Sequence, residues 1–417
     1  MTAGRLKQEL LDRLCRYIAF DTRSDPTSRA IPSTPGQWDL ARLLLQELEG
    51  MGLAEVFLTE HCHLYACLPH NLDPGHACAR HPFPIGFIAH LDTAPGYSGK
   101  DVSPRIIRRY RGGPIALENS HILDPAVDPH LSTCRGHTLV TTDGTTLLGG
   151  DDKAGIAIIM ALLSLLIHQP RIPRPEIWVA FLPDEEIGRG TDHFDKNRFR
   201  ARAAYTLDGG PLGEISRENF NGDTASITFI GRDIHPGDAK DLMVNALKAA
   251  SHLVSLLPQK TAPEATSHRE PFIHPVELEA GVSHAALLCT LRAFESTASL
   301  RRQLKALVKK TDDAFPGVKV QVAFKENYRN MAQELEMAPW VCDHLEAALR
   351  RTGVEPYWKP VRGGTDGACL TAMGLPCPNI FTGVHNGHGP LEWVSADVME
   401  TAVHTLVNLA RVWVNEA

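Results

Sequence analysis

Four apolar segments of this 417-residue chain each lead into an acidic residue or a histidine. The segments, with the polar residues that follow them, are 84–89 with His90 and Asp92, 176–182 with Glu185 and Glu186, 203–207 with Asp208, and 378–383 with His388. In open α/β sheets the ligand crevice lies beyond the carboxyl ends of the strands. Separate strands can therefore deliver these side chains to one place, and the pattern predicts an α/β fold with a functional site at that edge of the sheet.

A fifth acidic stretch follows two glycines. Residues 146–155 run from an apolar strand end into Asp151 and Asp152, and a long apolar helix pattern follows at 154–168. A carboxylate has two oxygens, so one aspartate here can bridge two metal ions, as two-metal hydrolytic sites require. An acidic pair at a helix start is also typical of a helix cap, and this stretch alone leaves both interpretations open.

The order of the predicted elements changes between Asp208 and His388. Strand and helix patterns follow one another there at 224–231, 245–257, 276–281, 285–293, 297–315 and 319–325. Their order, β-α-β-β-α-β, is that of a ferredoxin-like domain. A chain of 417 residues that is 43% hydrophobic is long enough for two cores. We therefore expect a small domain at 220–329, inserted into a larger α/β domain made of 1–219 and 330–417.

Composition excludes several classes of partner. A formal net charge of -7 and the lack of a basic run disfavour a nucleic-acid surface. No segment approaches the length of a membrane span, and the charged, helix-like start of the chain does not resemble a signal peptide. Nine cysteines without a C-x-x-C pair suit reduced thiols. We expect a cytoplasmic enzyme with neither nucleic-acid nor membrane partners.

The groups at the strand ends suit a metal site. Imidazoles and carboxylates in this proportion favour zinc, or manganese or cobalt in the same geometry, over calcium or magnesium. In His90-x-Asp92 alternate residues of an extended chain point the same way, so the carboxylate can hydrogen-bond the ring nitrogen that faces away from the metal. Glu185 and Glu186 are adjacent and point in opposite directions. One of them can therefore ligate while the other takes a proton from water.

Longer motifs connect these groups to a known superfamily. They include Gly86-Phe-Ile-Ala-His-Leu-Asp-Thr93, Pro183-Asp-Glu-Glu-Ile-Gly-Arg-Gly190, Tyr205-Thr-Leu-Asp-Gly-Gly210, Arg362-Gly-Gly-Thr-Asp-Gly367 and Gly374-Leu-Pro-Cys-Pro-Asn-Ile-Phe-Thr-Gly383. With them the chain resembles, over nearly its whole length, the zinc-dependent exopeptidase superfamily, which also holds aminoacylases, dipeptidases and succinyl-diaminopimelate desuccinylases. The last three motifs are narrower and resemble those of its tripeptide aminopeptidases.

The resemblance implies a fold and a set of residue roles. The implied fold is a catalytic domain with a mixed central sheet flanked by helices, plus the inserted ferredoxin-like domain as a lid. The implied two-metal site has His90 and Asp208 on one zinc ion, Glu186 and His388 on the other, Asp151 bridging them, Glu185 as general base and Asp92 behind His90. It also implies that His235, Arg292 and Arg362 contact the substrate, and that the peptide bond between Asp151 and Asp152 is cis.

The implied activity is that of a di-zinc aminopeptidase, which removes the N-terminal residue from short peptides and from tripeptides above all. An arginine that grips the terminal carboxylate in bidentate fashion, Arg292 or Arg362, would fix the length of the peptide. The lid would bring His235 to the substrate carbonyl. Relatives that form homodimers through their lids can supply this histidine from the partner subunit, and the sequence leaves both arrangements open.

Two departures and two rival functions are weighed against this interpretation. Position 385 is a histidine where an aromatic residue is expected, and we prefer His388 to His385 as the ligand. Gly150 stands where alanine is usual, a change that we expect not to alter coordination. One rival is a dipeptidase or an N-acyl amino acid deacylase of the same superfamily. The other is a catalytically silent metal-binding protein that acts through its lid, against which the intact Glu185 argues. The motifs specify neither the native metal nor the preferred side chains.

Overall fold

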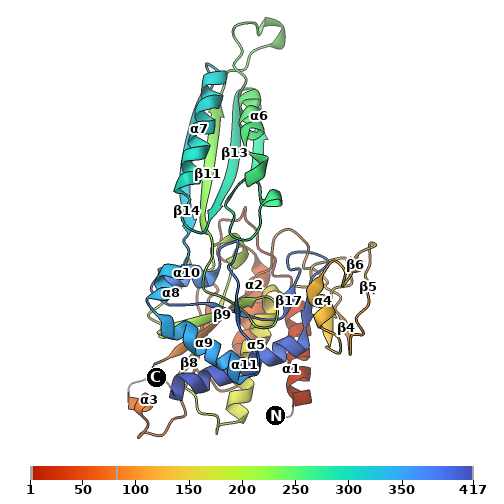
Figure 1. The fold of residues 1–417 in the computed structure, drawn as a ribbon, viewed down its shortest axis with the longest axis vertical. Coiled ribbons are helices and arrows are strands. Elements are labelled where there is room, and N and C mark those ends of the chain that lie inside the picture. Colours follow the sequence, from red (N-terminus) through yellow and green to blue (C-terminus); the bar gives the residue numbers. More distant parts are fainter. Residues whose placement is uncertain (1–2, 81–82, 416–417) are drawn as a thin grey trace. The chain divides into compact units, whose positions relative to one another are not determined.

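The computed structural model describes residues 3–80 and 83–415, and the chain forms two compact units (Figure 1). The first unit comprises Met1–Arg217, Gln333–Lys359 and Thr365–Ala417, and the second comprises Glu218–Ala332 and Pro360–Gly364. The predicted mixed α/β fold is confirmed. The short segment Pro360–Gly364, which holds Arg362, lies in the second unit rather than in the first.

The first unit is built on an eight-stranded mixed sheet. Its strands, in spatial order, are β1 (Ala54–Leu58), β2 (Leu64–Leu68), β8 (Ile177–Leu182), β3 (Ile85–His90), β9 (Ala203–Gly209), β16 (Asn379–Phe381), β10 (Glu214–Ser216) and β15 (Tyr357–Trp358). The four central strands, β8, β3, β9 and β16, are all parallel to one another. Their carboxyl ends therefore meet at one edge, as the four apolar segments predict.

Both faces of this sheet are covered, which is why its central strands are continuously apolar. Phe87 and Val179 point to the core that includes helices α1 (Ala3–Ile18), α2 (Pro35–Gly50), α5 (Gly150–His168), α9 (Pro339–Arg351) and α11 (Ala396–Asn415). Their neighbours Ile88 and Trp178 point to a second core on the opposite face, together with Leu370 of α10 (Asp366–Ala372). Alternate residues of each strand therefore serve opposite layers.

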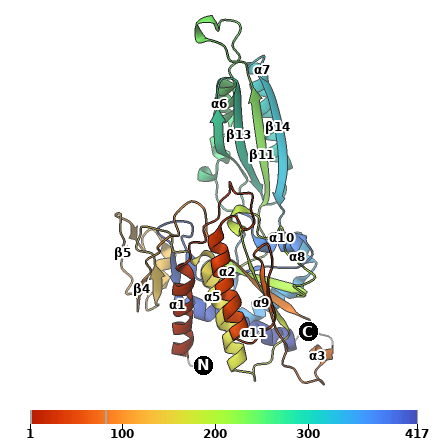
Figure 2. The ribbon, with the colours of Figure 1, turned by 180° about the vertical axis from the view of Figure 1, so that it is seen from behind.

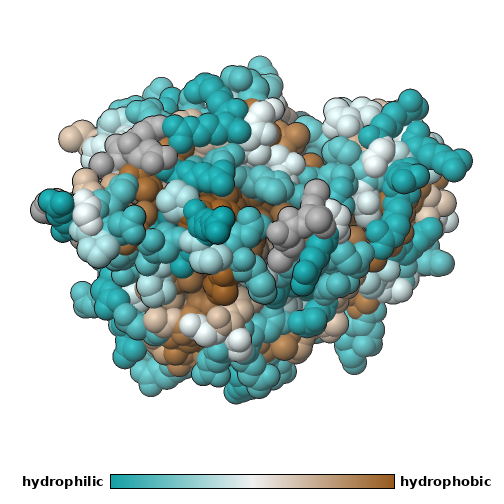
Figure 3. Space-filling model, turned by 90° about the horizontal axis from the view of Figure 1, so that it is seen from below, coloured by the Kyte–Doolittle hydropathy of each residue, from teal (hydrophilic) through white to brown (hydrophobic). Residues whose placement is uncertain are grey.

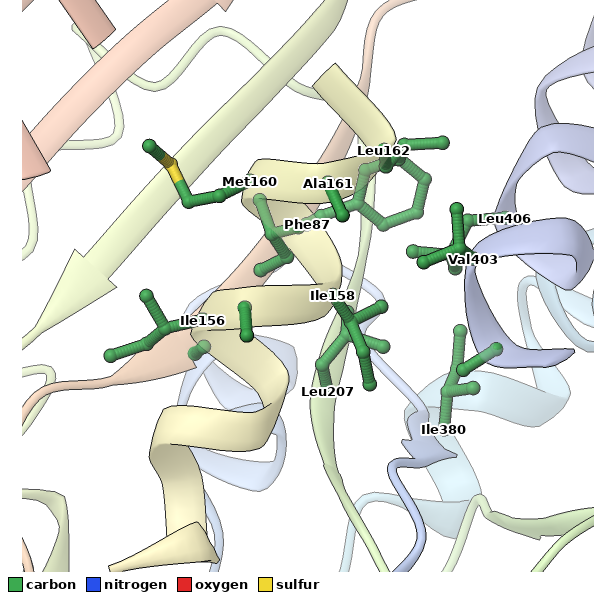
Figure 4. Close-up of a cluster of buried hydrophobic side chains, with 14 of the residues drawn as sticks. Phe87, Ile156, Ile158, Met160, Ala161, Leu162, Leu207, Ile380, Val403 and Leu406 are labelled. Carbon is green, nitrogen blue, oxygen red and sulfur yellow. The ribbon is translucent and has the colours of Figure 1, made fainter. Parts of the chain in front are cut away.

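Helix α5 is the central helix of this unit, and it packs against α1 and α11 as well as against the sheet (Figures 1 and 2). Figure 4 shows Ile158 of this helix among Phe87 of β3, Leu207 of β9 and Val403 of α11. Each buried aliphatic side chain of this kind contributes about 1.5–3 kcal/mol. A helix held on all sides provides a rigid base for Asp151 in its first turn.

Shorter elements complete the first unit. A four-stranded antiparallel sheet has the order β17 (Val384–His385), β18 (Trp393–Ser395), β7 (Leu139–Thr141) and β4 (Arg105–Ile107), and β5 (Ile115–Ala116) pairs with β6 (Ile122–Leu123). Three further α-helices are short: α3 (Ala77–Arg80), α4 (Pro129–Thr133) and α8 (Ala332–Glu336). None of the helices in the described part of the chain is both long enough and apolar enough to cross a membrane.

The second unit has the β-α-β-β-α-β order that the sequence predicts. Its elements are β11 (Asn221–Ile230), α6 (Ala246–Leu256), β12 (Phe272–Ala280), β13 (His284–Ala293), α7 (Ala298–Ala314) and β14 (Lys319–Tyr328). The strands form an antiparallel sheet in the order β12, β13, β11, β14. Residues of α6 and α7 form a separate hydrophobic core with alternate residues of β11 and β13, so the unit has a core of its own.

Seen from below, the molecule's surface is mostly hydrophilic with scattered apolar residues (Figure 3).

Candidate metal centre

The side chains that follow the central strands meet at Asp151. Its Oδ1 lies 3.1 Å from Nε2 of His90, and its Oδ2 lies 3.1 Å from Nε2 of His388. Nε2 of His388 is also 3.1 Å from Oε1 of Glu186, and Nε2 of His90 is 3.9 Å from Oδ1 of Asp208. Thus the five predicted ligands form one cluster. The two oxygens of Asp151 face opposite halves of it, which is the arrangement that a bridging carboxylate needs.

The neighbouring Asp152 is held differently. Its donor atom lies close enough to those of His90 and Asp208 to complete a metal-binding group. However, its Oδ2 accepts a hydrogen bond from the backbone N–H of His90, and its Oδ1 accepts one from that of Gly155, both at 3.2 Å. Because backbone donors occupy both oxygens, we assign Asp152 to the support of the site rather than to the metal.

A sharp turn brings Asp151 into place. Gly149 has φ 78°, in the left-handed region that favours glycine, and Asp151 and Asp152 both have non-helical backbone angles. The predicted cis peptide bond between the two aspartates is present. At Gly150 a Cβ atom would lie 2.5 Å from Cγ2 of Val394, so this position has no room for a side chain.

Gly150→Ala is therefore expected to destabilise the turn, although alanine is the residue that the resemblance leads one to expect at this position. Overpacking against a β-branched side chain costs about 1–3 kcal/mol. Urea unfolding of the metal-free protein measures this cost, and Gly50→Ala is the control because a Cβ at Gly50 meets no atom within 4 Å. Equal stability of the two variants would mean that the Val394 side chain moves aside without a loss of stability.

Asp92 links the two sides of the site. Nδ1 of His90 lies 3.0 Å from the backbone oxygen of Asp92 and 3.4 Å from its Oδ1. The same carboxylate accepts hydrogen bonds from the backbone N–H groups of Glu185 at 2.9 Å and Glu186 at 3.1 Å. Asp92 thus holds the ring of His90 and also the turn that carries both glutamates, a second contact that the sequence pattern does not indicate.

Asp184 anchors the same turn from the other side. It is fully buried, with φ 56°, and its carboxylate accepts hydrogen bonds from the backbone N–H and the hydroxyl of Ser33 and from Nε2 of Gln37. No feature of the local sequence indicates this role of Asp184. Ser33 and Gln37 lie about 150 residues away in the chain, in the loop and helix start at 32–38, so no local pattern reveals the contact.

Burial gives the cluster unusual electrostatics. It raises the pKa of Glu185 and of Asp208, and the neighbouring carboxylates raise both further. The pKa of His388 rises to about 11 because Nε2 of its ring lies 3.1 Å from a carboxylate oxygen of Asp151 and 3.1 Å from one of Glu186. For His90, burial lowers the pKa, but bonds with Asp151 and Asp92 outweigh it and the net shift is upward. Protons on the two histidines therefore compensate a concentration of buried negative charge, a task that cations can also perform.

The donor set fits a pair of divalent cations. Oε1 of Glu186 is buried and accepts no hydrogen bond of acceptable geometry, although Nε2 of His388 lies 3.1 Å away. A buried carboxylate oxygen without a donor is costly unless a cation faces it. Two imidazoles and three carboxylates are ligands that zinc, manganese and cobalt accept.

His385 takes part in packing instead. Its ring stacks on Trp393 with a centroid distance of 4.0 Å, and burial lowers its pKa to about 4. The structure brings His388, not His385, to Asp151 and Glu186.

The three predicted substrate-binding residues all lie in the second unit. His235 is exposed in the loop after β11, where its Nδ1 accepts a hydrogen bond from Gly237. Arg292 lies in β13 with its guanidinium over the ring of Tyr328. Arg362 donates hydrogen bonds to Thr266 and to the carbonyl oxygen of His268.

Comparison with known proteins identifies the class of enzyme to which this fold and donor set correspond. The model of Peptidase family M20/M25/M40 matches residues 138–412. The chain belongs to this family, and it is accordingly a hydrolase that cleaves peptide bonds.

The relatives are more specific than the family. Peptidase T of Geobacillus thermodenitrificans is 44% identical over 98% of this chain and 99% of its own, and peptidase T of Vibrio parahaemolyticus is 45% identical over 97% and 98%. The resemblance to this group of aminopeptidases is thereby confirmed. The structure of aminopeptidase PepT from Bacillus cereus, 20% identical, has the same fold with a TM-score of 0.73 over 97% of this chain and 98% of that one.

Proposed function

We propose that the chain is a two-zinc aminopeptidase that releases the N-terminal residue of tripeptides. The observation that supports it most is the position of Asp151, whose two oxygens each lie 3.1 Å from a different histidine. His90 and Asp208 would hold one ion, Glu186 and His388 the other, with Asp151 between them. When bound, a pair of such cations supplies Lewis-acid polarisation of a carbonyl and lowers the pKa of water.

Glu185 is the proposed general base. Its backbone N–H is held by Asp92 in the same turn as that of Glu186. Burial raises its pKa, which makes the carboxylate a stronger base than one in water. Glu185 would take a proton from the attacking water and later deliver it to the leaving amine.

Arg292 is the better candidate for the peptide's terminal carboxylate. Arg362 already donates to Thr266, to His268 and to Glu270, and its guanidinium packs on Phe220. A substrate would have to replace those bonds. For Arg292 the hydrogen bonds in the described chain run only through Nη1, to the backbone oxygens of Asp223 and Leu291. Its remaining donors match the planar fork that binds a carboxylate at two points.

Arg292→Lys is expected to raise KM for tripeptides by about tenfold and to weaken the preference for a free terminal carboxylate, because a lysine cannot bind it at two points. The measurement compares kcat/KM for a tripeptide and for its C-terminal amide. Arg302→Lys, an exposed arginine on α7, is the control. An unchanged ratio of acid to amide would assign the carboxylate to another residue.

Arg292 lies at one end of a strand ladder, and His235 follows the other end of it. Gly222 pairs with Arg292 at one end of the β11–β13 ladder, and Ile230 pairs with His284 at the other end, near His235. Eight residues of strand span about 27 Å. An extended tripeptide spans roughly 10 Å. If both residues contact substrate, one comes from a second copy, so we propose a homodimer in which the second unit acts as a lid and supplies His235 to its partner.

A panel of peptides tests the proposed function. The protein is loaded with zinc, manganese or cobalt and assayed with a dipeptide, a tripeptide, a tetrapeptide and an N-acetyl amino acid. We expect the tripeptide to be cleaved fastest. Faster cleavage of the dipeptide, or of the acetylated compound, would favour the dipeptidase or the deacylase instead.

The nine cysteines are all free, and we propose the cytoplasm as the location of the enzyme.

A further inference from the structure

Glu392 is a buried acidic residue that the reaction described above does not use. It is 1% exposed, and it lies between His388 and β18. Its Oε2 accepts hydrogen bonds from the backbone N–H groups of Leu148 and Gly149, both at 2.8 Å, and its Oε1 accepts one from that of Asp151 at 2.9 Å. One carboxylate thus binds three donors at the start of α5, where the helix itself offers them no partner.

These three bonds fix the backbone from which the bridging side chain projects. Asp151 leaves the helical conformation, with φ -82° and ψ 102°, and helical hydrogen bonds do not determine its direction. Glu392 instead binds the backbone N–H of Asp151 and, on the other side of Gly150, those of Leu148 and Gly149. A rotation of this peptide would move both oxygens of Asp151 away from their places between His90 and His388.

The same segment also supplies a ligand and the packing around the turn. His388 lies four residues before Glu392, and Val394 lies two residues after it, where its Cγ2 closes the space above Gly150. The segment is itself tied by a bond from the N–H of Glu392 to the oxygen of Gly389. The distance between His388 and Asp151 is therefore set by one short piece of backbone.

We propose that Glu392 is a positioning residue that holds Asp151 between the two metal ions and so sets their affinity. The inference rests on the two-metal site proposed above. A carboxylate buried close to the acidic cluster is costly unless charge-assisted hydrogen bonds offset its desolvation, and the three backbone donors do so. A cap that served α5 alone would stabilise the protein with and without metal equally. A positioning residue stabilises the metal-bound form more.

The test compares zinc affinities by competition with a chromophoric chelator. Glu392→Gln keeps the shape of the side chain but turns an amide N–H₂ group toward backbone donors. We expect its zinc affinity to fall by about 10–100-fold, as for other groups that orient metal ligands. The matched control is Glu214→Gln, a buried carboxylate of the same unit that binds Lys359 at 2.8 Å and Tyr357 at 3.3 Å. Its zinc affinity should equal that of the wild type.

Each outcome decides the question. Wild-type zinc affinity in folded Glu392→Gln overturns the proposal. If that variant does not fold, Glu392→Asp, which keeps the charge but shortens the reach, is measured in the same way. A weakened affinity supports the proposal, whereas wild-type affinity, or loss of the fold in both variants, makes Glu392 a structural cap. Failure of the wild-type protein to bind two zinc ions would instead remove the two-metal site itself.

Discussion

Glu185→Ala will keep both metal ions and lose about 10²–10⁴-fold in kcat for a tripeptide, since general acid–base catalysis contributes that much. The substitution removes the carboxylate but none of the five proposed ligands. It also leaves the turn in place, because Asp92 binds the backbone N–H groups of residues 185 and 186 rather than their side chains. Metal content by mass spectrometry and kcat on the zinc-loaded protein are the two measurements.

The neighbouring glutamate is the control for that result. Oε1 of Glu186 lies 3.1 Å from Nε2 of His388 within the cluster, so Glu186→Ala is expected to lose metal as well as activity. If Glu185→Ala loses zinc while Glu186→Ala retains it, the roles of the two residues are the reverse of those proposed. Glu185→Gln, which keeps the volume of the side chain, checks that the loss of kcat is not due to a cavity.

His235→Ala will lower kcat by about 10²–10³-fold, with a smaller effect on KM. A hydrogen bond to the developing oxyanion matters mainly in the transition state, and loss of one such donor has an effect of this size. The fold and the metal content should not change, because His235 is exposed and in contact only with its own loop in the described chain. Steady-state kinetics on the purified variant measure kcat and KM, and metal analysis measures the metal content.

Mixing His235→Ala with Glu185→Ala then decides between the two arrangements. In a homodimer that exchanges His235, each mixed dimer regains one intact site, so random mixing restores about a quarter of the wild-type activity. Native mass spectrometry with one isotope-labelled chain confirms the exchange of subunits. No recovery in exchanged dimers would place His235 at its own chain's site. Wild-type rates for His235→Ala alone would remove the residue from the mechanism.

The parts of the fold that follow from local pattern could be predicted from the sequence. The buried strands β3, β8 and β9 are mainly apolar: β3 ends at His90, β8 ends at Leu182 shortly before Glu185, and β9 ends one residue after Asp208. The insertion shows its β-α-β-β-α-β order through the alternation of strand and helix periods. The sequence predicts that this strand begins at 276, because Pro275 is a residue that usually ends a strand. In the structure β12 begins at Phe272. Pro275 is tolerated there since β12 is an edge strand with an irregularity between Pro275 and Glu277.

What the sequence did not reveal depends on contacts between distant residues. Glu392 binds backbone groups more than 240 positions away, and Asp184 binds Ser33 at a separation of 151. Neither residue stands out locally from other acidic residues. Strands of two or three residues, such as β5 and β17, are too short to show a period. The assignment of Arg362 to the second unit follows from the pairing of Asn219 with Val361, which no pattern in either segment indicates.

Titration of the metal-free protein with zinc, followed by turnover of a tripeptide, tests the two-metal site most directly. The geometry around Asp151 predicts that activity rises to a plateau at two zinc ions per chain, and that the products are the free N-terminal residue and a dipeptide. A plateau at one ion per chain, or full activity in the presence of a strong chelator, would contradict it.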